Sequence, residues 1–488
     1  MIPRPVAVKL ALVALALPAI ACQPQPVCEK HPARPECLPK VEVAGLPSRI
    51  PWPPTSPQVI PAPPGLNPAV HKLQLDLRFA TDPLSDCSAD ASAPSSMGTV
   101  EIPVRVAEGR LPGPAEWVLR ACNVAAGESP EIVRAAVSVY VPPQFEQARQ
   151  VVDTQPGPGT SVVEYRGVAL APGRIYAYET IRTMTPARRL RLLSPEGAPI
   201  ILANDEFFTV EDNRQVVVSG GAGLFPLIPA AMGSPSIDVK LAPFAPLVGW
   251  FSQTLPSDGK LLAADAGGDR LALVQAKQIS LYAMTPDNKS LSESLGACPL
   301  DSSMQLLAVA IARGSPHPPA KATESSASTV TRSIQATAVV LGMTSGQPRV
   351  VACNETLVSA PGANDRSVVA VDDQAQSCFQ QALSKAAQPP THIALADLDA
   401  DGLLDLVAAP AAQSQRLFYV PGEIRGSDCG LVEIPVGQPS STLQGLAVGA
   451  TGGTRLVGSD PKSPVIPDLA LADPNGITYL KRRSPTQL

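Results

Sequence analysis

The chain has 488 residues, which is enough for two or three domains. Its 38 basic and 43 acidic residues give a net charge of −5 without a basic cluster, and this excludes a protein that binds nucleic acid through a basic surface. Apolar residues make up 45% of the chain, which excludes an intrinsically disordered protein. Proline (55 residues) outnumbers glycine (35 residues), a composition that favours short strands and turns over long helices.

The N-terminus has the pattern of a secretion signal. Arg4 and Lys9 precede an apolar run at residues 10–21. This run is shorter than the ~20 apolar residues that a membrane-spanning helix needs. The sequence therefore predicts a signal peptide over residues 1–21. Its removal leaves 36 basic and 43 acidic residues, a net charge of −7.

Cys22 follows a short run of mostly small residues, Leu17-Pro18-Ala19-Ile20-Ala21. This run resembles a bacterial lipobox, whose cysteine becomes the acylated first residue of the mature protein and holds it on a membrane. Gln23, where an aspartate would otherwise stand, resembles the signal for outer-membrane sorting in Gram-negative envelopes. These features predict a lipid-anchored protein of the bacterial cell envelope, at the outer membrane. The alternative is an ordinary signal peptide cut near Ala21.

A proline-rich segment comes next and predicts a tether over residues 22–68. Its prolines crowd one stretch: Pro47, Pro51, Pro53, Pro54, Pro57, Pro61, Pro63, Pro64 and Pro68. Such a segment favours extended polyproline conformation and spaces a domain from the membrane. Residues 69–150 then alternate between apolar and polar positions, which is typical of half-buried strands. They predict either a small β domain or early, divergent blades of the fold that follows.

The chain has nine cysteines, of which eight remain once Cys22 is assigned to the lipid. An even number in an exported chain favours disulfides, and eight cysteines allow 105 connectivities. None has the paired short spacing of a zinc site. We predict that cysteines adjacent in the sequence pair with each other, which joins Cys28 to Cys37, Cys87 to Cys122, Cys298 to Cys353, and Cys378 to Cys429.

A repeat is visible from about residue 151 onward. Its clearest copy has apolar strands at 392–396, 406–409, 416–420 and 431–434, and four such strands with tight turns make one blade of a β-propeller. Five points taken as equivalent lie 57, 66, 67 and 64 residues apart: Val217, Val274, Val340, Val407 and Leu471. The period exceeds the ~40–50 residues of a lean blade, so some loops are enlarged. The Ser/Thr/Pro stretch from Gly314 to Ser333 is one predicted insertion.

The strongest chemical signal is the loop inside the clearest copy, Asp397-Leu398-Asp399-Ala400-Asp401-Gly402-Leu403-Leu404-Asp405. Four carboxylates around one glycine can turn several oxygens onto a hard cation, with calcium the preferred ion. Carboxylates at this spacing repel one another unless a cation or exposure to water relieves them. An EF-hand is disfavoured, because Ala408 stands at the twelfth position, where a bidentate glutamate belongs. The remaining alternative is a solvated acidic turn without an ion.

The Asp-x-Asp-x-Asp-Gly-x-x-Asp run followed by an apolar strand resembles the FG-GAP/VCBS repeat family, and the five copies together cover roughly residues 200–485. The resemblance implies an all-β, degenerate propeller at 151–488 with about five to seven four-stranded blades. It also implies one calcium ion held by Asp397, Asp399, Asp401, Asp405 and the backbone carbonyl of Leu403. The copies near Glu211, Asp265 and Asp468 lack the acidic cluster, so no metal is expected there.

Sequence motifs of common enzymes are absent. None of the four histidines lies in His-Glu-x-x-His, and no Gly-x-Ser-x-Gly, phosphate loop or dinucleotide fingerprint occurs. We therefore expect a non-enzymatic binding or scaffold module, held at the membrane by its lipid, with an unidentified protein or glycan partner and no nucleic acid. One alternative is a metal-dependent hydrolase acting on a polysaccharide or phosphoester. Another is a structural component of a surface assembly.

Overall fold

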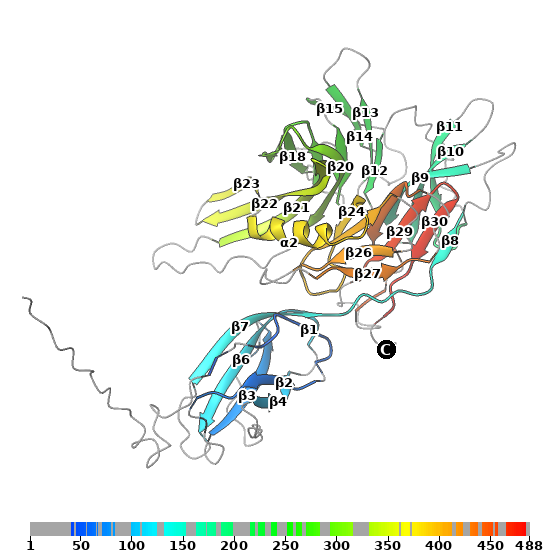
Figure 1. Cartoon of the computed structure of the whole chain (residues 1–488). Coiled ribbons are helices and arrows are strands. Elements are labelled where there is room, and N and C mark those ends of the chain that lie inside the picture. Colours follow the sequence, from blue (N-terminus) through cyan, green and yellow to red (C-terminus); the bar gives the residue numbers. More distant parts are fainter. Residues whose placement is uncertain are drawn as a thin grey trace, which may run out of the picture.

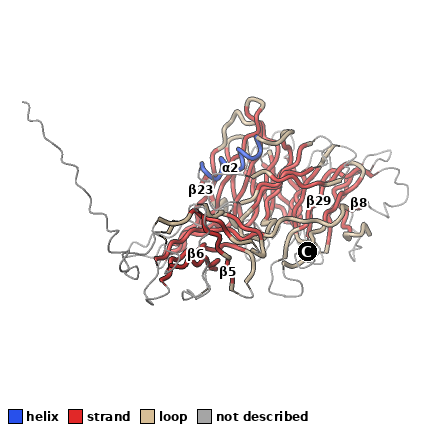
Figure 2. The backbone as a smooth tube through the Cα atoms, turned by 60° about the horizontal axis from the view of Figure 1, so that its bottom comes forward, coloured by secondary structure: helices blue, strands red, loops and turns tan. Residues whose placement is uncertain are grey.

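The computed structural model describes residues 41–484 apart from a set of internal gaps. The gaps are 43–44, 55, 65, 67–70, 80–81, 83–98, 108–109, 124–130, 153–162, 172, 182–186, 199–214, 220–222, 230–235, 242–250, 257–259, 266–269, 284–292, 316–330, 361–362, 371–372, 412–415, 423–429, 438–441, 452–453 and 457–464. The described chain is nearly all β-strand and has one helix, α2 (Asp373–Ser384), as Figures 1 and 2 show.

The N-terminal part is a small β domain, drawn in blue and cyan at the bottom of Figure 1. Its larger sheet has the order β1-β7-β6-β3-β5, formed by Arg49–Pro51, Glu131–Tyr140, Gly113–Asn123, His71–Phe79 and Val104–Val106. Its smaller sheet pairs β2 (Gln58–Pro61) with β4 (Thr99–Ile102). Ile60 and Ile102 of the smaller sheet share one apolar cluster with Leu75 and Trp117 of the larger one. The two sheets therefore bury a common core between them.

Strands β1 and β2 lie inside the range that the sequence predicted to be a tether. The prediction is wrong over these residues, because β1 pairs with β7 and β2 pairs with β4. The prolines did not prevent pairing, since Pro51 and Pro61 end their strands and both strands lie at sheet edges, where proline is tolerated. Pro47, just before β1, accepts a hydrogen bond from the buried indole of Trp117 at 2.8 Å. Residues 22–40 of the predicted tether lie outside the described part.

Six further sheets follow in the described part of the chain. The first three are β11-β10-β9 (Ala187–Leu193, Arg174–Ile181, Val163–Ala171), β12-β13-β14-β15 (Gln215–Ser219, Gly223–Pro229, Ser236–Leu241, Phe251–Pro256) and β16-β17-β18-β19 (Leu261–Ala264, Arg270–Val274, Gln278–Ala283, Gly296–Pro299). The fourth is β20-β21-β22-β23 (Gln305–Arg313, Thr331–Thr344, Gln347–Ala360, Ala363–Ala370). The fifth is β24-β25-β26-β27 (Pro390–Ala396, Asp405–Pro410, Arg416–Val420, Val432–Pro435), and the sixth is β28-β29-β30-β8 (Gly445–Gly449, Asp468–Asp473, Gly476–Leu480, Arg149–Val151).

The six sheets are arranged cyclically. In each sheet, the strand that comes first in the sequence contacts the corresponding strand of the next sheet. The order is β9, β12, β16, β20, β24 and β28, and β28 contacts β9 again. In Figure 1 the last, red strands accordingly lie beside the cyan strands β8 and β9. We call this part of the molecule the six-sheet ring.

Within the described residues, apolar clusters fill four of the spaces between neighbouring sheets of the ring. One cluster joins the third and fourth sheets, another the fourth and fifth with α2, another the fifth and sixth, and another the sixth and first. Strands packed on both faces need apolar residues at successive positions, and every residue of β25 and of β29 is buried. This explains why the repeat appears in the sequence as short continuous apolar runs.

The first and sixth sheets pack most closely at two glycines of β28. A Cβ on Gly445 would lie 3.0 Å from the Cα of Gly167, and a Cβ on Gly449 would lie 2.9 Å from the Cβ of Leu170. Real side-chain atoms do not approach one another this closely, so glycine permits the contact between β28 and β9. The ends of the cycle therefore meet backbone to backbone.

The sixth sheet is completed from the opposite end of the sequence. Its first three strands come from the C-terminal part, and the outer strand β8 pairs antiparallel with β30. Beyond this pair, the Glu146 amide donates to the Lys481 carbonyl at 2.8 Å and the Arg483 amide donates to the Gln144 carbonyl at 2.9 Å. The segment that leaves the small domain is therefore fastened to the C-terminal strand.

The repeat points derived from the sequence agree with this arrangement in four places of five. Val274, Val340, Val407 and Leu471 all lie in the second strand of their sheets. Val217 instead lies in β12, the first strand of its sheet. The short apolar run at β12 resembles a second strand in composition, and only the pairing of β12 with β13 distinguishes the two.

Three of the predicted cysteine pairings have a member in the described part, and for Cys122 of β6 only the backbone is described. Cys298 and Cys353 form a disulfide that joins the third and fourth sheets, which confirms this pairing. Cys378 of α2 is also disulfide-bonded, while its predicted partner Cys429 lies outside the described residues. Cys28, Cys37 and Cys87 also lie outside, as do the signal peptide and Cys22. Among the described helices, none is long and apolar enough to cross a membrane.

Candidate metal centre

The acidic loop connects β24 to β25 in the fifth sheet, and Ala396 and Asp405 pair across its base. Asp399, Asp401 and Asp405 are each 0% exposed, so this is not a solvated turn. The loop bends through left-handed backbone at Ala400 (φ 60°) and Gly402 (φ 83°). A residue with a Cβ pays a conformational penalty there, which Gly402 avoids and Ala400 does not.

Backbone amides of the same loop orient the carboxylates. Asp405 accepts hydrogen bonds from the amides of Leu398 (2.7 Å) and Asp399 (3.3 Å), and from the Gly422 amide (2.7 Å) after β26. Three further amide bonds hold the other acids: Asp401 N to Asp399 Oδ1 (3.2 Å), Leu403 N to Asp401 Oδ1 (2.8 Å), and Gly402 N to Asp397 Oδ2 (3.0 Å). The loop is thus wound around its own acidic side chains.

Three of the predicted ligands converge. Asp397, Asp399 and Asp405 each offer a carboxylate oxygen, and these oxygens lie within 4.8 Å of one another. One calcium ion with Ca–O distances of 2.3–2.6 Å spans oxygens up to about 5 Å apart. In addition, Asp397 Oδ1 is buried and has no hydrogen-bond partner within the described part of the chain. A buried, unsatisfied carboxylate oxygen costs free energy that a cation would offset, so the residues present fit a metal ion.

Asp401, another predicted ligand, is placed differently, and the Leu403 carbonyl stays a prediction. Asp401 is buried beside the triad, and one of its oxygens accepts a hydrogen bond from the Ser138 hydroxyl. Leu403 donates its amide to Asp401, and its side chain is buried. The structure therefore gathers three of the four predicted carboxylate ligands into one triad and turns Asp401 toward the small β domain.

The electrostatics of the loop are those of crowded acids removed from water. Burial raises the pKa of Asp397 to about 7, and the nearby charge of Asp399 adds to the rise. Burial and then the charge of Asp399 raise the pKa of Asp401 to about 8. Burial also places the pKa of Asp405 well above its usual value. A raised pKa means that the ionised form of a carboxylate is unfavourable at this site, and a nearby cation would stabilise it.

Three residues at the loop were not found from the sequence: Arg49, Ser138 and Tyr419. The Arg49 guanidinium forms an ion pair with Asp399 and lies 3.8 Å from Asp401. Tyr419 of β26 donates its hydroxyl to Asp399 at 2.5 Å. Arg49 is 350 positions from Asp399 in the sequence, and Ser138 is 263 positions from Asp401. No local sequence pattern therefore predicts either contact.

The corresponding loop of the sixth sheet repeats the scaffold without the acidic cluster. Asp468 begins β29 as Asp405 begins β25, and it is also 0% exposed. It accepts hydrogen bonds from the Thr451 amide (3.1 Å), the Tyr479 hydroxyl (2.9 Å) and the Arg482 amide (2.7 Å), and also from the Thr451 hydroxyl. Protein donors alone therefore surround this acid.

The third sheet has a weaker equivalent. Asp265, after β16, accepts the Arg270 amide at 2.8 Å and lies 3.5 Å from the Arg313 guanidinium. Asp269 and the predicted copy near Glu211 lie outside the described residues. Asp265 is thus a structural acid of a turn, tied to an arginine of the neighbouring sheet.

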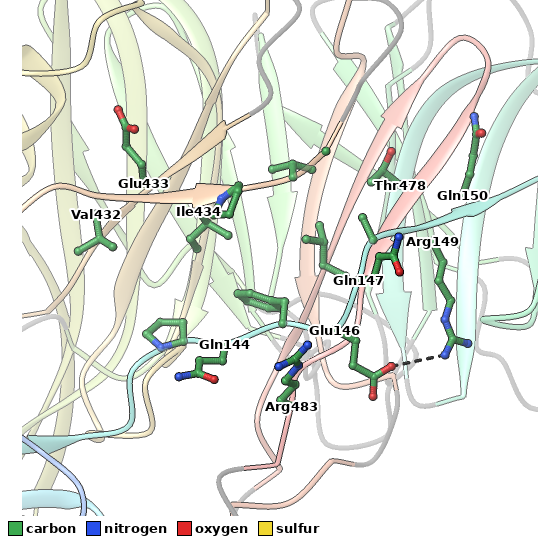
Figure 3. Close-up of a pocket in the computed structure, with 17 residues that line it drawn as sticks. Gln144, Glu146, Gln147, Arg149, Gln150, Val432, Glu433, Ile434, Thr478 and Arg483 are labelled. Carbon is green, nitrogen blue, oxygen red and sulfur yellow. Dashed lines mark hydrogen bonds and ion pairs between the residues drawn. The ribbon is translucent and has the colours of Figure 1, made fainter. Parts of the chain in front are cut away.

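A cleft of about 730 Å³ lies between the outer strand β27 and the segment that leads into β8. Figure 3 shows its polar lining, with Gln144, Gln147 and Gln150 on one side and Glu433 on the other. Glu146 and Arg149 form an ion pair of 3.4 Å within it. The cleft is a concave surface where two neighbouring sheets of the ring diverge.

Comparison with known proteins adds no family assignment. No protein-family model matches the chain, and no curated protein matches it. Among solved structures, an auxiliary nutrient binding protein from Bacteroides thetaiotaomicron aligns at 9% identity over 90% of this chain and 96% of its own, with a TM-score of 0.35. Kuenenia stuttgartiensis hydrazine synthase aligns at 13% identity over 75% and 92%, with a TM-score of 0.33. A functionally unknown protein from Desulfotomaculum acetoxidans aligns at 11% identity over 66% and 86%, with a TM-score of 0.29. Likenesses at these TM-scores carry no argument about this chain.

Proposed function

We propose that the chain is a lipid-anchored, non-enzymatic binding or scaffold protein of the bacterial envelope, whose ring is a six-bladed, calcium-stabilised β-propeller of the FG-GAP/VCBS type. The observation that carries the proposal is the triad Asp397, Asp399 and Asp405 with the unsatisfied buried oxygen of Asp397. Calcium supplies there a double positive charge and a preference for several oxygen ligands. The residues that would hold it are the three aspartates of the triad.

The propeller part of the proposal is supported by the cyclic contacts of the first strands and by the apolar clusters between neighbouring sheets. Radially packed sheets that close on themselves leave only short outer edges, which is how propellers avoid exposed sheet edges. Completion of the sixth sheet by β8 fastens the two ends of the ring to each other.

A structural role for the ion is favoured over hydrolysis. A catalytic metal keeps an open coordination position and is accompanied by groups that face the substrate. Here each of the four acids of the loop already accepts a hydrogen bond from within the protein. Three of them are completely buried. Groups arranged in this way pin a loop, and binding then takes place on other surfaces of the ring, such as the cleft beside β27.

Thermal unfolding of the mature protein in calcium, in magnesium and in chelator tests the metal. Calcium at 100 times its Kd should stabilise the native state by about 2.7 kcal/mol, because a ligand that binds only the folded state acts by mass action. Asp397→Ala should abolish this shift. Asp301→Ala, which removes an acid from an exposed turn, is the matched control and should keep it. If millimolar calcium does not raise the unfolding temperature of the wild type, the proposed calcium site is wrong.

The anchor needs a separate test in a Gram-negative host. Wild-type protein should incorporate an alkyne-labelled fatty acid and sediment with membranes, whereas Cys22→Ser should do neither. Equal labelling and equal sedimentation of the two proteins would contradict acylation at Cys22 and would leave the ordinary signal peptide as the correct interpretation.

A further inference from the structure

The acidic loop touches the small β domain as well as the ring. Arg49 of β1 pairs with Asp399, and its guanidinium also stacks over Tyr140 at 4.2 Å from the ring centre. Ser138 of β7 donates its hydroxyl to Asp401. Both carboxylates are fully buried, so the Arg49–Asp399 pair is not a loose ion pair of the protein surface, and the Ser138–Asp401 hydrogen bond is buried as well.

The backbone and apolar atoms of the loop take part in the same contact. The amide of Val141 donates to the Asp399 carbonyl at 2.7 Å. Ala400, at the left-handed bend, packs in one cluster with Val141, Leu456 and Ile466. The Cα of Gly402 faces Pro114, because a Cβ built there would lie 3.2 Å from the proline ring. The small domain therefore recognises the wound conformation of the loop as well as its charges.

One aspartate belongs to both arrangements. Asp399 is a member of the metal triad, and its Oδ2 accepts hydrogen bonds from Arg49 and Tyr419 while Oδ1 accepts from the Asp401 amide. The loop carries four carboxylates, whereas the small domain brings one guanidinium to it. A divalent cation at the triad offsets the excess negative charge and holds the loop in the bend that the small domain contacts.

We propose that the acidic loop is a cation-dependent docking site for the chain's own small β domain, in which calcium at the triad and Arg49 with Ser138 at Asp399 and Asp401 bind cooperatively. The inference rests on the proposed calcium site. Calcium would then fix the orientation of the ring relative to the domain that follows the membrane anchor. Binding surfaces of the ring would be presented in one direction when calcium is present.

The connecting segment limits the motion that undocking permits. The Arg482 guanidinium donates to the carbonyls of Val141 (3.2 Å) and Gln144 (3.4 Å), and the backbone of 144–146 pairs with 481–483. These contacts keep the segment on the ring whether or not the small domain is docked. Release of Arg49 and Ser138 would thus allow the small domain to pivot near Val141 without leaving the ring.

The test measures the distance between one label on each part of the full mature chain. Ile132 of the small domain and Val369 of the ring are exposed, and unnatural amino acids at these positions avoid the cysteines. Pulsed electron spin resonance is recorded in calcium and in chelator. In the wild type, chelation should broaden the distance distribution about twofold as undocked orientations become populated. In R49Q/S138A the distribution should be broad under both conditions, although calcium still raises the unfolding temperature.

Arg134→Gln is the matched control. It removes an arginine from the same strand as Ser138, but Arg134 pairs with Glu116 within the small domain, so the response to calcium should be that of the wild type. A wild-type distribution that is equally narrow in calcium and chelator, or a narrow distribution in R49Q/S138A, would overturn the docking proposal and leave the calcium site standing. Failure of the wild type to gain thermal stability in calcium would overturn the site itself and the docking with it.

Discussion

The loops of the fifth and sixth sheets are built on the same scaffold and differ in how they balance charge. Asp405 and Asp468 each begin the second strand, are fully buried, and accept an amide located two residues past the end of the third strand, at Gly422 and Arg482 respectively. A tyrosine near the end of the third strand contacts the loop in both sheets, Tyr419 in one and Tyr479 in the other.

The difference lies in what surrounds the shared aspartate. In the sixth sheet Thr451 supplies both an amide and a hydroxyl to Asp468, and protein donors satisfy a single negative charge. In the fifth sheet three further acids stand in the loop, and the buried Asp397 Oδ1 finds no donor within the described chain. The comparison teaches that one scaffold either neutralises a lone acid internally or gathers acids that require a cation.

The largest expected effect is on the internally satisfied loop. Asp468→Ala removes the acceptor of the Thr451 and Arg482 amides and one partner of the buried Tyr479 hydroxyl, which also contacts the Thr451 hydroxyl. At about 1–3 kcal/mol for each orphaned group, partly relieved by relaxation, we expect a loss of about 3–5 kcal/mol. Denaturant unfolding measures it. The loss should be the same in calcium and in chelator, and a loss confined to calcium would show that this loop also needs a metal.

The next effect concerns the metal triad. Asp397 accepts a hydrogen bond from the Gly402 amide at the partly exposed side of the loop, so Asp397→Ala should cost only about 1 kcal/mol in chelator. In calcium at 100 times Kd it should additionally forfeit the ~2.7 kcal/mol that the ion contributes. Denaturant unfolding in the two buffers separates these terms. Equal losses in both buffers would mean that Asp397 does not bind the ion.

A further expectation concerns the pH dependence of the acidic loop in the fifth sheet. The folded pKa values of Asp397 and Asp401 are raised to about 7 and about 8, above the ordinary value near 4 of the unfolded chain. The native state therefore holds more protons between about pH 4 and pH 8, and in chelator stability should fall as pH rises through this window, by at most about 1.4 kcal/mol per pH unit for each proton.

In calcium the same fall should be smaller, because the ion takes the place of the protons and binds more tightly as the carboxylates ionise. Chemical denaturation at a series of pH values, with and without calcium, gives both curves. Curves that run parallel from pH 5 to pH 8 would contradict a shared site for protons and the ion.

The smallest effects come from the two tyrosine hydroxyls. Tyr479→Phe removes one of several donors to Asp468 and should cost about 1 kcal/mol in either buffer. Tyr419→Phe removes a donor to Asp399, which the ion and Arg49 also neutralise. We expect it to cost about 1 kcal/mol in chelator and less in calcium, measured as a double-mutant cycle with calcium as the second perturbation. If Tyr419→Phe costs the same free energy in both buffers, Asp399 does not bind the ion.

Much of the local structure was readable from the sequence. Apolar runs, turn residues and spacing predicted four features: the all-β composition, the strands flanking the acidic loop, four of five repeat points, and the pairing of Cys298 with Cys353. These features depend on neighbours a few residues away or on the regular period of the repeat. The grouping of Asp397, Asp399 and Asp405 has the same origin, since nine consecutive residues supply all three acids.

The remainder depended on packing between distant segments. Arg49 is one of many arginines in the sequence and becomes distinctive only when the small domain lies against the loop. Asp468 carries no motif because its donors, Thr451, Tyr479 and Arg482, are spread over the sheet. Strands β1 and β2 were hidden by prolines that ordinarily indicate a spacer but are tolerated at sheet edges.

Equilibrium dialysis with radioactive calcium at pH 8 tests the central claim most directly, by comparing the ions bound per chain in the wild type and in Asp397→Ala. The expected result is that the wild type binds one ion more than the variant, with both proteins folded as judged by circular dichroism. Equal numbers of bound ions, or no binding to the wild type at millimolar calcium, would contradict a metal centre at Asp397, Asp399 and Asp405.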